Sequence, residues 1–375
     1  MTVGKTLLVT NDFPPRQGGI QAFVHQLALR QDPGELIVFA SSSPGAEQFD
    51  AEQPFPVVRY PGSMLLPTPG VARRVQHLVR EYGCDRAWFG ASAPLGLLAP
   101  ALRRVGVERV VAQTHGHEVG WAALPVARTL LRRIAAGADV LTYLGDYTRR
   151  RIAAAVGDRT TFEWLPPGVD TAAYSPEVNG NPVRLRHGID DRPVIVCVSR
   201  LVPRKGQDTL IWTLPAVRDR VPDATLLLVG KGPDEPRLRR LATDIGVSEH
   251  VVFTGGVPWE ELPAHYAAGD VFAMPCRTRR AGMDVEGLGI VYLEASATGL
   301  PVIAGDSGGA TDAVRDGETG FVVGGRNHVN LVERLVTLLT DPDLARKLGD
   351  AGRAWTLDQW QWARLAARMG ELLRG

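Results

Sequence analysis

The sequence predicts an α/β protein of two domains, each built around a parallel β-sheet. Short apolar runs alternate with longer amphipathic segments, which is the order of strands and helices in a parallel sheet. The chain has 375 residues, and at roughly 100 to 200 residues per domain this length favours two domains over one. Hydrophobic residues make up 45% and charged residues 22% of the chain. A large buried core is therefore possible, and extended disorder is not expected.

The apolar runs form two series, one in each half of the chain. In the first half we expect strands at 6–10, 35–40, 57–60, 87–90, 110–114, 140–143 and 161–165. In the second half we expect them at 194–199, 225–230, 251–254, 271–275, 301–304 and 320–323. Helical patterns fill most of the gaps, so each half is predicted to be a Rossmann-like domain.

A turn-rich segment after the first series predicts the domain boundary. It contains PPGVD at 166–170 and NGNP at 179–182, and such density of Pro, Gly and Asn is typical of a connection. The last segment has apolar residues at helical spacing, so we expect a terminal helix that packs on a domain. The expected divisions are an N-terminal domain at 1–170, a linker at 171–190, a C-terminal domain at 191–355 and the helix at 356–375.

Charge and cysteine content exclude several classes of protein. Lys and Arg number 42 against 41 Asp and Glu, a net charge of +1, so no basic field argues for nucleic acid as a partner. The three cysteines, Cys84, Cys197 and Cys276, have no metal-ligand spacing, which fits a reducing compartment and argues against zinc. No apolar segment is long enough for a signal peptide or a spanning helix, so we expect a cytoplasmic protein.

The sharpest candidate site is the segment 284–295, which follows an expected strand. Glu286 and Glu294 stand eight positions apart around Gly287-Leu288-Gly289-Ile290. If a helix begins near Gly289, its free N–H groups can hold a phosphate that the glycines allow to approach. Eight residues span ~12 Å along a helix, about the reach across a nucleotide sugar, so each glutamate could bind one of its two sugars. The alternative is a surface glutamate beside an ordinary helical one.

Two other loops carry candidate ligand-binding residues. Arg200 and Lys205 follow the strand expected at 194–199, at the sheet edge where α/β folds bind ligands, and two fixed cations suit a diphosphate. Gly18 and Gly19 lie between the first strand and the first helix. Their loop lacks both the G-x-G-x-x-G spacing and the Walker lysine. A solvated surface loop is the alternative for Arg200 and Lys205, and a glycine pair alone is weak evidence for a phosphate site.

The segment Thr114-His115-Gly116-His117-Glu118 ends another expected strand. Either histidine could donate to a sugar hydroxyl or stabilise developing charge. We assign His115 to the ligand site and His117 to a structural role. Because the loops contain no Asp-any-Asp motif, we expect no metal site and no tightly bound cofactor, although Mg²⁺ from solution could assist a diphosphate.

Together these residues resemble the retaining GT-B glycosyltransferases of family 4. The resemblance covers nearly the whole chain and implies two Rossmann-like domains facing a central cleft, with the C-terminal helix returning toward the N-terminal domain. Segments 10–21, 114–121, 199–208 and 284–295 are most similar to the branch that uses GDP-mannose as donor. The acceptor implied is the inositol of a phosphatidylinositol monomannoside, and the product an α-1,6-linked dimannoside.

The resemblance also implies a role for each site residue. Gly19 would meet the diphosphate, with Gly18 beside it in the substrate site, Arg200 and Lys205 the phosphates, Glu286 the mannose hydroxyls, Glu294 the ribose and His115 the mannose. Asp12 could touch the acceptor. Family members retain the anomeric configuration, and the usual proposal is a front-face mechanism in which the departing diphosphate helps to deprotonate the acceptor. The preference for guanine over other bases rests on the resemblance alone.

A lipid acceptor requires contact with an anionic membrane, and two surfaces in the first half of the chain fit it. The first is the apolar run 64–67 and the helix after it, where Arg73, His77 and Arg80 share one face. The second is the apolar run 121–125, which three arginines follow. Basic amphipathic surfaces bind anionic head groups, so we expect peripheral association with the inner face of the cell membrane. Ordinary helices packed on their own sheet are the alternative.

Three other functions stay open at this point. A family 4 transferase with another nucleotide sugar or a soluble acceptor would have the same site residues, and liposome binding would separate it. A nicotinamide dehydrogenase would also have two Rossmann-like halves, but the dinucleotide fingerprint is missing. An inactive sugar-binding scaffold would bind GDP-mannose without turnover.

Overall fold

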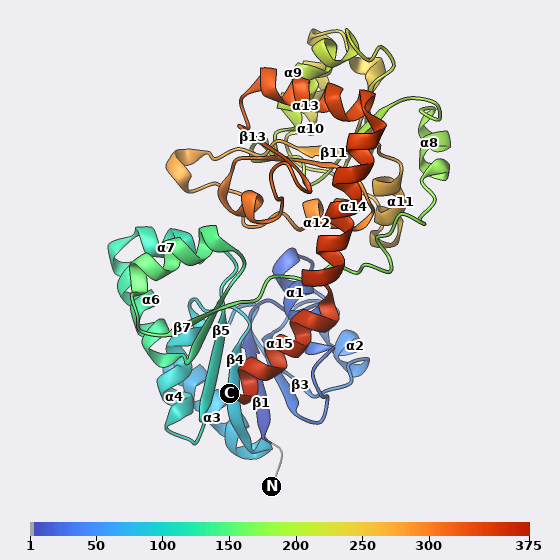
Figure 1. The fold of residues 1–375 in the computed structure, drawn as a ribbon. Helices are drawn as coiled ribbons and strands as arrows, with labels where there is room; N and C mark the ends of the chain where they lie inside the picture. Colours follow the sequence, from blue (N-terminus) through green and yellow to red (C-terminus); the bar gives the residue numbers. More distant parts are fainter. Residues whose placement is uncertain (1–3) are drawn as a thin grey trace. The chain divides into compact units, whose positions relative to one another are not determined.

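The computed structural model describes residues 4–375, apart from the side chain of Ala281, and divides into two compact units (Figure 1). Unit 1 combines the chain up to Gly168 with Trp362–Gly375, and unit 2 is Val169–Gln361. Residues 1–3 of the domain expected at 1–170 lie outside the described residues.

Unit 1 is built on a parallel sheet. Within the described residues its seven strands lie in the order β3-β2-β1-β4-β5-β6-β7. They are β1 (Lys5–Thr10), β2 (Leu36–Ser41), β3 (Val57–Tyr60), β4 (Cys84–Phe89), β5 (Arg109–Gln113), β6 (Val140–Tyr143) and β7 (Thr161–Trp164). Leu8 of β1 pairs with Val38 on one side and Trp88 on the other. The strand order reverses direction between β1 and β4, and ligands of such sheets bind beyond the carboxyl ends of strands at this switch point.

Helices cover both faces of this sheet. They are α1 (Gly19–Ala28), α2 (Ala46–Ala51), α3 (Pro69–Tyr82), η1 (Leu95–Leu98), α4 (Ala99–Arg103), α5 (Glu118–Ala123), α6 (Pro125–Gly137), α7 (Asp146–Val156) and α15 (Trp362–Arg374). Buried side chains of α3, α4, α6 and α7 form one core with the strand residues Leu7, Val9 and Phe89. α1 and α15 pack on each other, and α15 crosses β4 and β5 (Figure 1).

The C-terminal helix returns to unit 1, as expected. Leu365, Met369 and Leu372 of α15 are buried, and the backbone carbonyl of Leu372 accepts a hydrogen bond from Arg109 Nε at 3.0 Å. The helix expected at 356–375 begins later, at Trp362. The carbonyl of Trp360 accepts the Val169 amide at 2.7 Å, and at this residue the preceding helix has ended.

Unit 2 repeats the architecture. Within the described residues its six strands lie in the order β10-β9-β8-β11-β12-β13. They are β8 (Val194–Val198), β9 (Thr225–Val229), β10 (Val251–Gly255), β11 (Val271–Met274), β12 (Val302–Gly305) and β13 (Gly320–Val323). The α-helices are α8 (Asn181–His187), α9 (Gln207–Arg218), α10 (Glu235–Asp244), α11 (Leu262–Ala267), α12 (Ile290–Ala297), α13 (His328–Thr340) and α14 (Pro342–Gln359). Short 3₁₀ turns are η2 (Pro203–Lys205), η3 (Ser248–His250), η4 (Trp259–Glu261), η5 (Arg280–Gly282) and η6 (Gly308–Asp312). The switch point lies between β8 and β11.

The segment expected as a linker at 171–190 belongs to unit 2. Its turns exist: Asp170 Oδ1 accepts the amides of Ala172 and Ala173 at 3.1 and 3.0 Å. However, Tyr174 is buried against the ring of Tyr266, with 5.5 Å between centroids. These turns therefore pack on the second sheet domain instead of spanning between two domains. At the other end, α14 continues beyond residue 355 to Gln359.

No helix in the described part of the chain combines the length and the apolar character needed to cross a membrane.

Candidate functional site

A buried ion pair lies at the switch point of unit 2. Lys205 ends η2 in the loop after β8, and Glu286 lies in the loop after β11. Lys205 Nζ and Glu286 Oε2 are 2.7 Å apart, and their side chains are only 10% and 8% exposed. Leaving either charge buried without the other would cost about 3–5 kcal/mol. The structure thus brings together one residue from each of the two loops that the sequence singled out.

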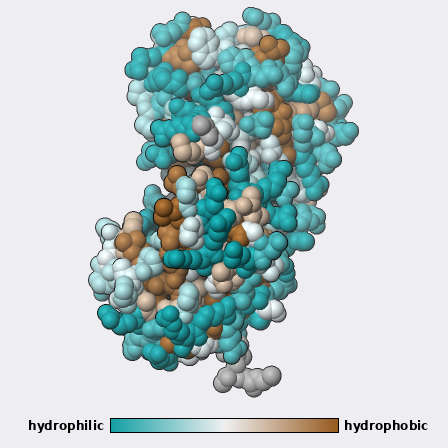
Figure 2. Space-filling model, turned by 90° about the vertical axis from the view of Figure 1, so that its left-hand side faces the viewer, coloured by the Kyte–Doolittle hydropathy of each residue, from teal (hydrophilic) through white to brown (hydrophobic). Residues whose placement is uncertain are grey.

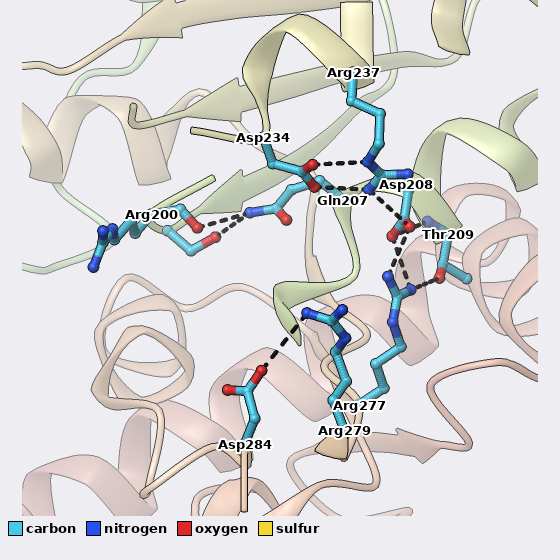
Figure 3. A network of polar contacts seen from close by, with 10 residues as sticks. Arg200, Gln207, Asp208, Thr209, Asp234, Arg237, Arg277, Arg279 and Asp284 are labelled. Carbon is cyan, nitrogen blue, oxygen red and sulfur yellow. Dashed lines mark hydrogen bonds and ion pairs between the residues drawn. The ribbon is translucent and has the colours of Figure 1, made fainter. Parts of the chain in front are cut away.

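Two arginines lie in the same loop as Lys205. Arg204 Nε lies 3.9 Å from Glu286 Oε2 and 3.7 Å from Asp284 Oδ1, so a second positive group faces the two acids. Arg200 is exposed and makes no ion pair with any other described residue. Its guanidinium points away from the neighbouring charge network (Figure 3). Arg200 is therefore available to an anionic ligand, whereas Lys205 is already held by Glu286.

The network in Figure 3 fixes the loops after β8 and β11 to helix α9. Asp208 accepts two hydrogen bonds from Arg277, at 2.8 and 2.7 Å, and one from Arg237 at 3.0 Å. Burial by itself would raise the pKa of Asp208, but the hydrogen bonds and charges of Arg277 and Arg237 outweigh it and the pKa is lowered. Gln207 Nε2 donates to Ser199 Oγ at 2.8 Å and to the carbonyl of Arg200 at 3.1 Å. The loop that carries Arg200 and Lys205 is therefore held at its base.

Glycines allow the loop around Glu286 to pack closely and to start a helix. Gly289 has φ +80° and precedes α12 with no side-chain cap, so the first N–H groups of α12 are open to an anion. A Cβ atom at Gly308 would lie 2.2 Å from the carbonyl oxygen of Glu286. Gly309 donates its N–H to the same carbonyl at 2.8 Å. The helix begins where the glycine pattern predicted.

Glu294 lies on α12 in the interior of unit 2. Its Oε2 accepts a hydrogen bond from Tyr266 Oη at 2.6 Å. Burial raises the pKa of Glu294 to about 7, and the hydrogen bond from Tyr266 opposes this rise. Within residues 4–375, Tyr266 alone hydrogen bonds to this carboxylate, which leaves Oε1 for another donor.

In unit 1 the loop after β1 leads into the uncapped start of α1. No side chain caps this helix at Gly18, and a Cβ atom at Gly19 would meet nothing within 4 Å. The surrounding protein atoms therefore do not require glycine at position 19, and the space beside it can admit a ligand. Asp12 is fixed nearby, since its Oδ1 accepts from Gln21 Nε2 at 2.8 Å.

His115 lies after β5, and its ring is held by a backbone carbonyl. Nε2 lies 2.5 Å from the carbonyl oxygen of Gly90, so Nε2 carries a proton and donates it there. Burial lowers the pKa of His115, although Glu118 and Gly90 act in the opposite direction. The ring is thus neutral near pH 7, and only Nδ1 is left for a ligand, as an acceptor. A histidine that donates to a sugar hydroxyl was expected at this position, but the contact with Gly90 removes Nε2 from that role.

Sequence reasoning missed Glu118, which organises this loop. Its carboxylate is fully buried. Oε2 accepts the His115 amide at 2.9 Å, and Oε1 accepts Ser92 Oγ at 3.0 Å. His117 Nε2 also lies 3.2 Å from Oε1, which agrees with a structural role for His117. The signal available in the sequence was the acidic residue next to a His-Gly-His run.

No group of three or more His, Cys, Asp or Glu side chains in the described chain is arranged to hold a metal ion. The cysteines are buried free thiols. Burial raises the pKa of Cys84 to about 11, of Cys197 to about 12 and of Cys276 to about 11, so all three stay protonated near neutral pH.

Comparison with known proteins finds similarity in both halves of the chain. A model of "Glycosyltransferase Family 4" matches residues 17–173, and a model of "Glycosyl transferases group 1" matches residues 183–355. A protein of Mycolicibacterium smegmatis is 56% identical over 98% of this chain and 98% of its own length. It is named GDP-mannose-dependent alpha-(1-6)-phosphatidylinositol monomannoside mannosyltransferase. The chain belongs to glycosyltransferase family 4.

Two more relatives of this family 4 glycosyltransferase span its full length. A Mycobacterium tuberculosis protein with the same name is 52% identical over 100% of this chain and 99% of the relative. A Corynebacterium glutamicum protein, named for a monoacylated form of the same acceptor, is 48% identical over 99% and 98%. Family membership makes the chain an enzyme and excludes the nicotinamide dehydrogenase as an interpretation.

Solved structures confirm the fold of the glycosyltransferase. Anabaena Alr3699/HepE in complex with UDP has a TM-score of 0.82 at 20% identity and covers 99% of both chains. A glycosyltransferase from Rickettsia africae has a TM-score of 0.82 at 16% identity, covering 99% of this chain and 98% of its own. The predicted GT-B architecture of two Rossmann-like parallel-sheet domains is therefore confirmed.

Proposed function

We propose that this glycosyltransferase moves mannose from GDP-mannose to a phosphatidylinositol monomannoside and releases GDP and the dimannoside. The observation that carries the proposal is the full-length identity of 48–56% to relatives named for this donor and acceptor. The Lys205–Glu286 pair at the unit 2 switch point supports it, because a nucleotide sugar needs both a cation for its phosphates and a carboxylate for its sugar hydroxyls.

The donor is assigned to unit 2. Arg200 and Lys205 neutralise the diphosphate, and the open N–H groups at the start of α12 bind its oxygens. Glu286 accepts hydrogen bonds from the mannose hydroxyls, and Glu294 from the ribose. Fixed positive charge near the leaving group lowers the barrier because it stabilises the charge that develops as the sugar departs. We expect no resident metal, and any Mg²⁺ arrives with the donor from solution.

We propose that transfer proceeds with retention on one face of the mannose. The bond between mannose C1 and the β-phosphate oxygen breaks, and the acceptor hydroxyl oxygen forms its bond to C1 from the same side. The hydroxyl proton passes to the departing diphosphate. His115 takes part through Nδ1, which accepts a hydrogen bond from a mannose hydroxyl, while Asp12 and the open space beside Gly19 serve the acceptor and the diphosphate.

The acceptor lipid is assigned to a membrane surface on unit 1. Met64, Leu66, Leu124 and Val126 are 60%, 47%, 61% and 77% exposed, respectively, which suits shallow insertion into head groups. Brown apolar patches interrupt the hydrophilic surface in Figure 2, which views the side that carries α6 and α7 in Figure 1. Arg132 and Arg133 on α6 are exposed as well.

Helix α3 contributes charge to this surface and not insertion. Val71, Val75 and Leu78 are buried in the core of unit 1, so the apolar face of α3 packs on its own sheet. Its exposed face carries Arg73, Arg74 and Arg80, which would attract anionic head groups. We propose peripheral association at the inner face of the cell membrane. The buried free thiols agree with a reducing compartment.

The donor is tested by offering labelled GDP-mannose and labelled UDP-glucose separately, with the monomannoside lipid in vesicles. The proposal expects product from GDP-mannose alone, with the α configuration at the new linkage by NMR. Transfer from UDP-glucose would replace the donor while leaving the family unchanged. Transfer to inositol phosphate in place of the lipid would overturn the acceptor.

A further inference from the structure

Glu294 has a buried partner that no sequence motif marks. Tyr266, on α11, is fully buried, and its hydroxyl lies 2.6 Å from Glu294 Oε2. Because burial raises the pKa of Tyr266 far above its usual value, the hydroxyl keeps its proton and is the donor. The carboxylate is the acceptor, through one oxygen only.

The ring of Tyr266 is fixed by its neighbours. It stacks on Phe272 of β11, with centroids 5.7 Å apart and planes inclined by 26°. The ring of Tyr174 meets it edge-on at 5.5 Å. Tyr174 is buried too, and its hydroxyl has no hydrogen-bond partner in the described structure. The hydroxyl of Tyr266 therefore cannot turn away from Glu294 without disturbing a packed aromatic cluster.

We propose that Tyr266 is a positioning residue of the donor site, which holds Oε2 of Glu294 so that Oε1 is presented to the ribose hydroxyls of the nucleotide sugar. This inference rests on the proposed function, which assigns the ribose to Glu294. One carboxylate oxygen is then committed to the protein and the other to the ligand. Without Tyr266 the side chain would be free to rotate, and ordering it would oppose donor binding.

Burial of the Glu294 carboxyl makes donor binding depend on pH, and the hydrogen bond from Tyr266 limits this dependence. Burial raises the pKa of Glu294 to about 7, so the carboxyl becomes protonated as pH falls below that value. A protonated carboxyl is a poorer acceptor for ribose hydroxyls. The groups that surround it are Tyr266 on α11, Tyr174 before α8 and, beside Tyr266, Cys197 on β8. Burial raises the pKa of all three, so they stay neutral. From α14, which packs against α12, the charged Arg353 donates to the backbone carbonyls of Tyr174 and Ala297.

The test compares Tyr266→Phe with Tyr174→Phe, the same change in the same aromatic cluster. At pH 7.5 we expect Tyr266→Phe to raise the KM for GDP-mannose about tenfold with kcat within about twofold, because a hydrogen bond to a charged group is lost from ground state and transition state alike. Its hydrogen bond lowers the pKa of Glu294, so in Tyr266→Phe the rise of KM with falling pH should begin at a higher pH than in the wild type. Tyr174→Phe should change neither quantity.

Glu294→Gln separates failure of the inference from failure of the proposed function. If Glu294→Gln raises KM and abolishes its pH dependence but Tyr266→Phe behaves like Tyr174→Phe, the positioning role is wrong and the ribose assignment stands. If Glu294→Gln leaves the KM for GDP-mannose unchanged, the ribose assignment falls and the inference falls with it. A purely structural role for Tyr266 would lower thermal stability without moving the pH at which KM rises.

Discussion

Lys205 and Glu286 are far apart in the sequence, but their side chains form one ion pair and fix each other's orientation. The sequence predicted both as ligand-binding residues, on different loops, and the structure joins them at 2.7 Å. Each buried charge therefore depends on the other for its geometry. A mutation of one residue changes both the ligand contact and its partner, so an isosteric change is more informative than alanine.

We predict that Glu286→Gln lowers kcat at least about 100-fold, because a neutral amide cannot replace a carboxylate that both orients Lys205 and accepts from mannose. The measurement is initial-rate transfer at saturating GDP-mannose, with Glu249→Gln, an exposed site on η3, as the matched control. Thermal melts of both variants identify an assay temperature at which both are folded. A kcat within threefold of the wild type would remove Glu286 from the site.

We expect His115 to make the free energy of unfolding depend on pH in the absence of substrate. Its folded pKa is lowered, chiefly by burial, while an unfolded histidine titrates near 6.5. Below pH 6.5 the unfolded chain binds a proton that the folded chain does not, so folding loses up to about 1.4 kcal/mol per pH unit at this residue until the folded pKa is reached.

The wild type should therefore lose more thermal stability between pH 7 and pH 5.5 than His115→Gln does. Calorimetry of both proteins across this range measures the difference. His328→Gln, an exposed site on α13, should follow the wild type. Parallel losses in the wild type and His115→Gln would show that His115 is not held neutral.

Residues that the sequence analysis missed act through tertiary contacts. Asp208 and Arg277 are 69 positions apart, and nothing near either residue indicates that they meet. Glu118 follows a His-Gly-His run, but its partners Ser92 and His115 come from two loops and only the fold brings all three together. Periodicity locates strands and helices, but it does not say which polar side chains will be buried together.

At the scale of elements, continuous apolar runs predicted the strands well because central parallel strands are buried on both faces. β4 is the instructive exception. It was expected from residue 87 because Asp85 and Arg86 interrupt the apolar pattern. In the structure the strand begins at Cys84. Arg86 is buried nonetheless and pairs with Glu35 at 3.2 Å. A paired charge can occupy a strand where the sequence pattern indicates a loop.

Helix α3 gives the prediction for membrane binding. Arg73→Gln, Arg74→Gln and Arg80→Gln together should weaken partitioning onto vesicles with anionic lipid about 100-fold, since each basic side chain near such a surface contributes about 1 kcal/mol. Cosedimentation at low salt measures it. The matched control makes the same three changes at Arg220, Arg315 and Arg346, exposed positions of unit 2. Equal losses in both triple variants would assign the effect to net charge and not to α3.

At the scale of the whole molecule, the double series of apolar runs predicted two Rossmann-like domains, and the family resemblance predicted the GT-B architecture. Neither observation predicted where one unit ends and the other begins. The turn residues at 171–190 predicted a linker, but the buried ring of Tyr174 packs this segment onto unit 2. The choice of nucleotide base in the donor also could not be derived from the physical properties of the residues. The family resemblance implies base contacts on the loops after Gly230 and Phe253. The amide of Gly230 donates to the carbonyl of Gly255 at 2.9 Å, and this backbone contact does not distinguish guanine from uracil.

The identity of the acceptor lipid can be measured in a single transfer assay. Labelled mannose from GDP-mannose is offered to the purified protein with phosphatidylinositol or its monomannoside in separate anionic vesicles. The account predicts a labelled dimannoside from the monomannoside vesicles and no product from phosphatidylinositol. Equal labelling of both lipids, or product from phosphatidylinositol alone, would contradict it.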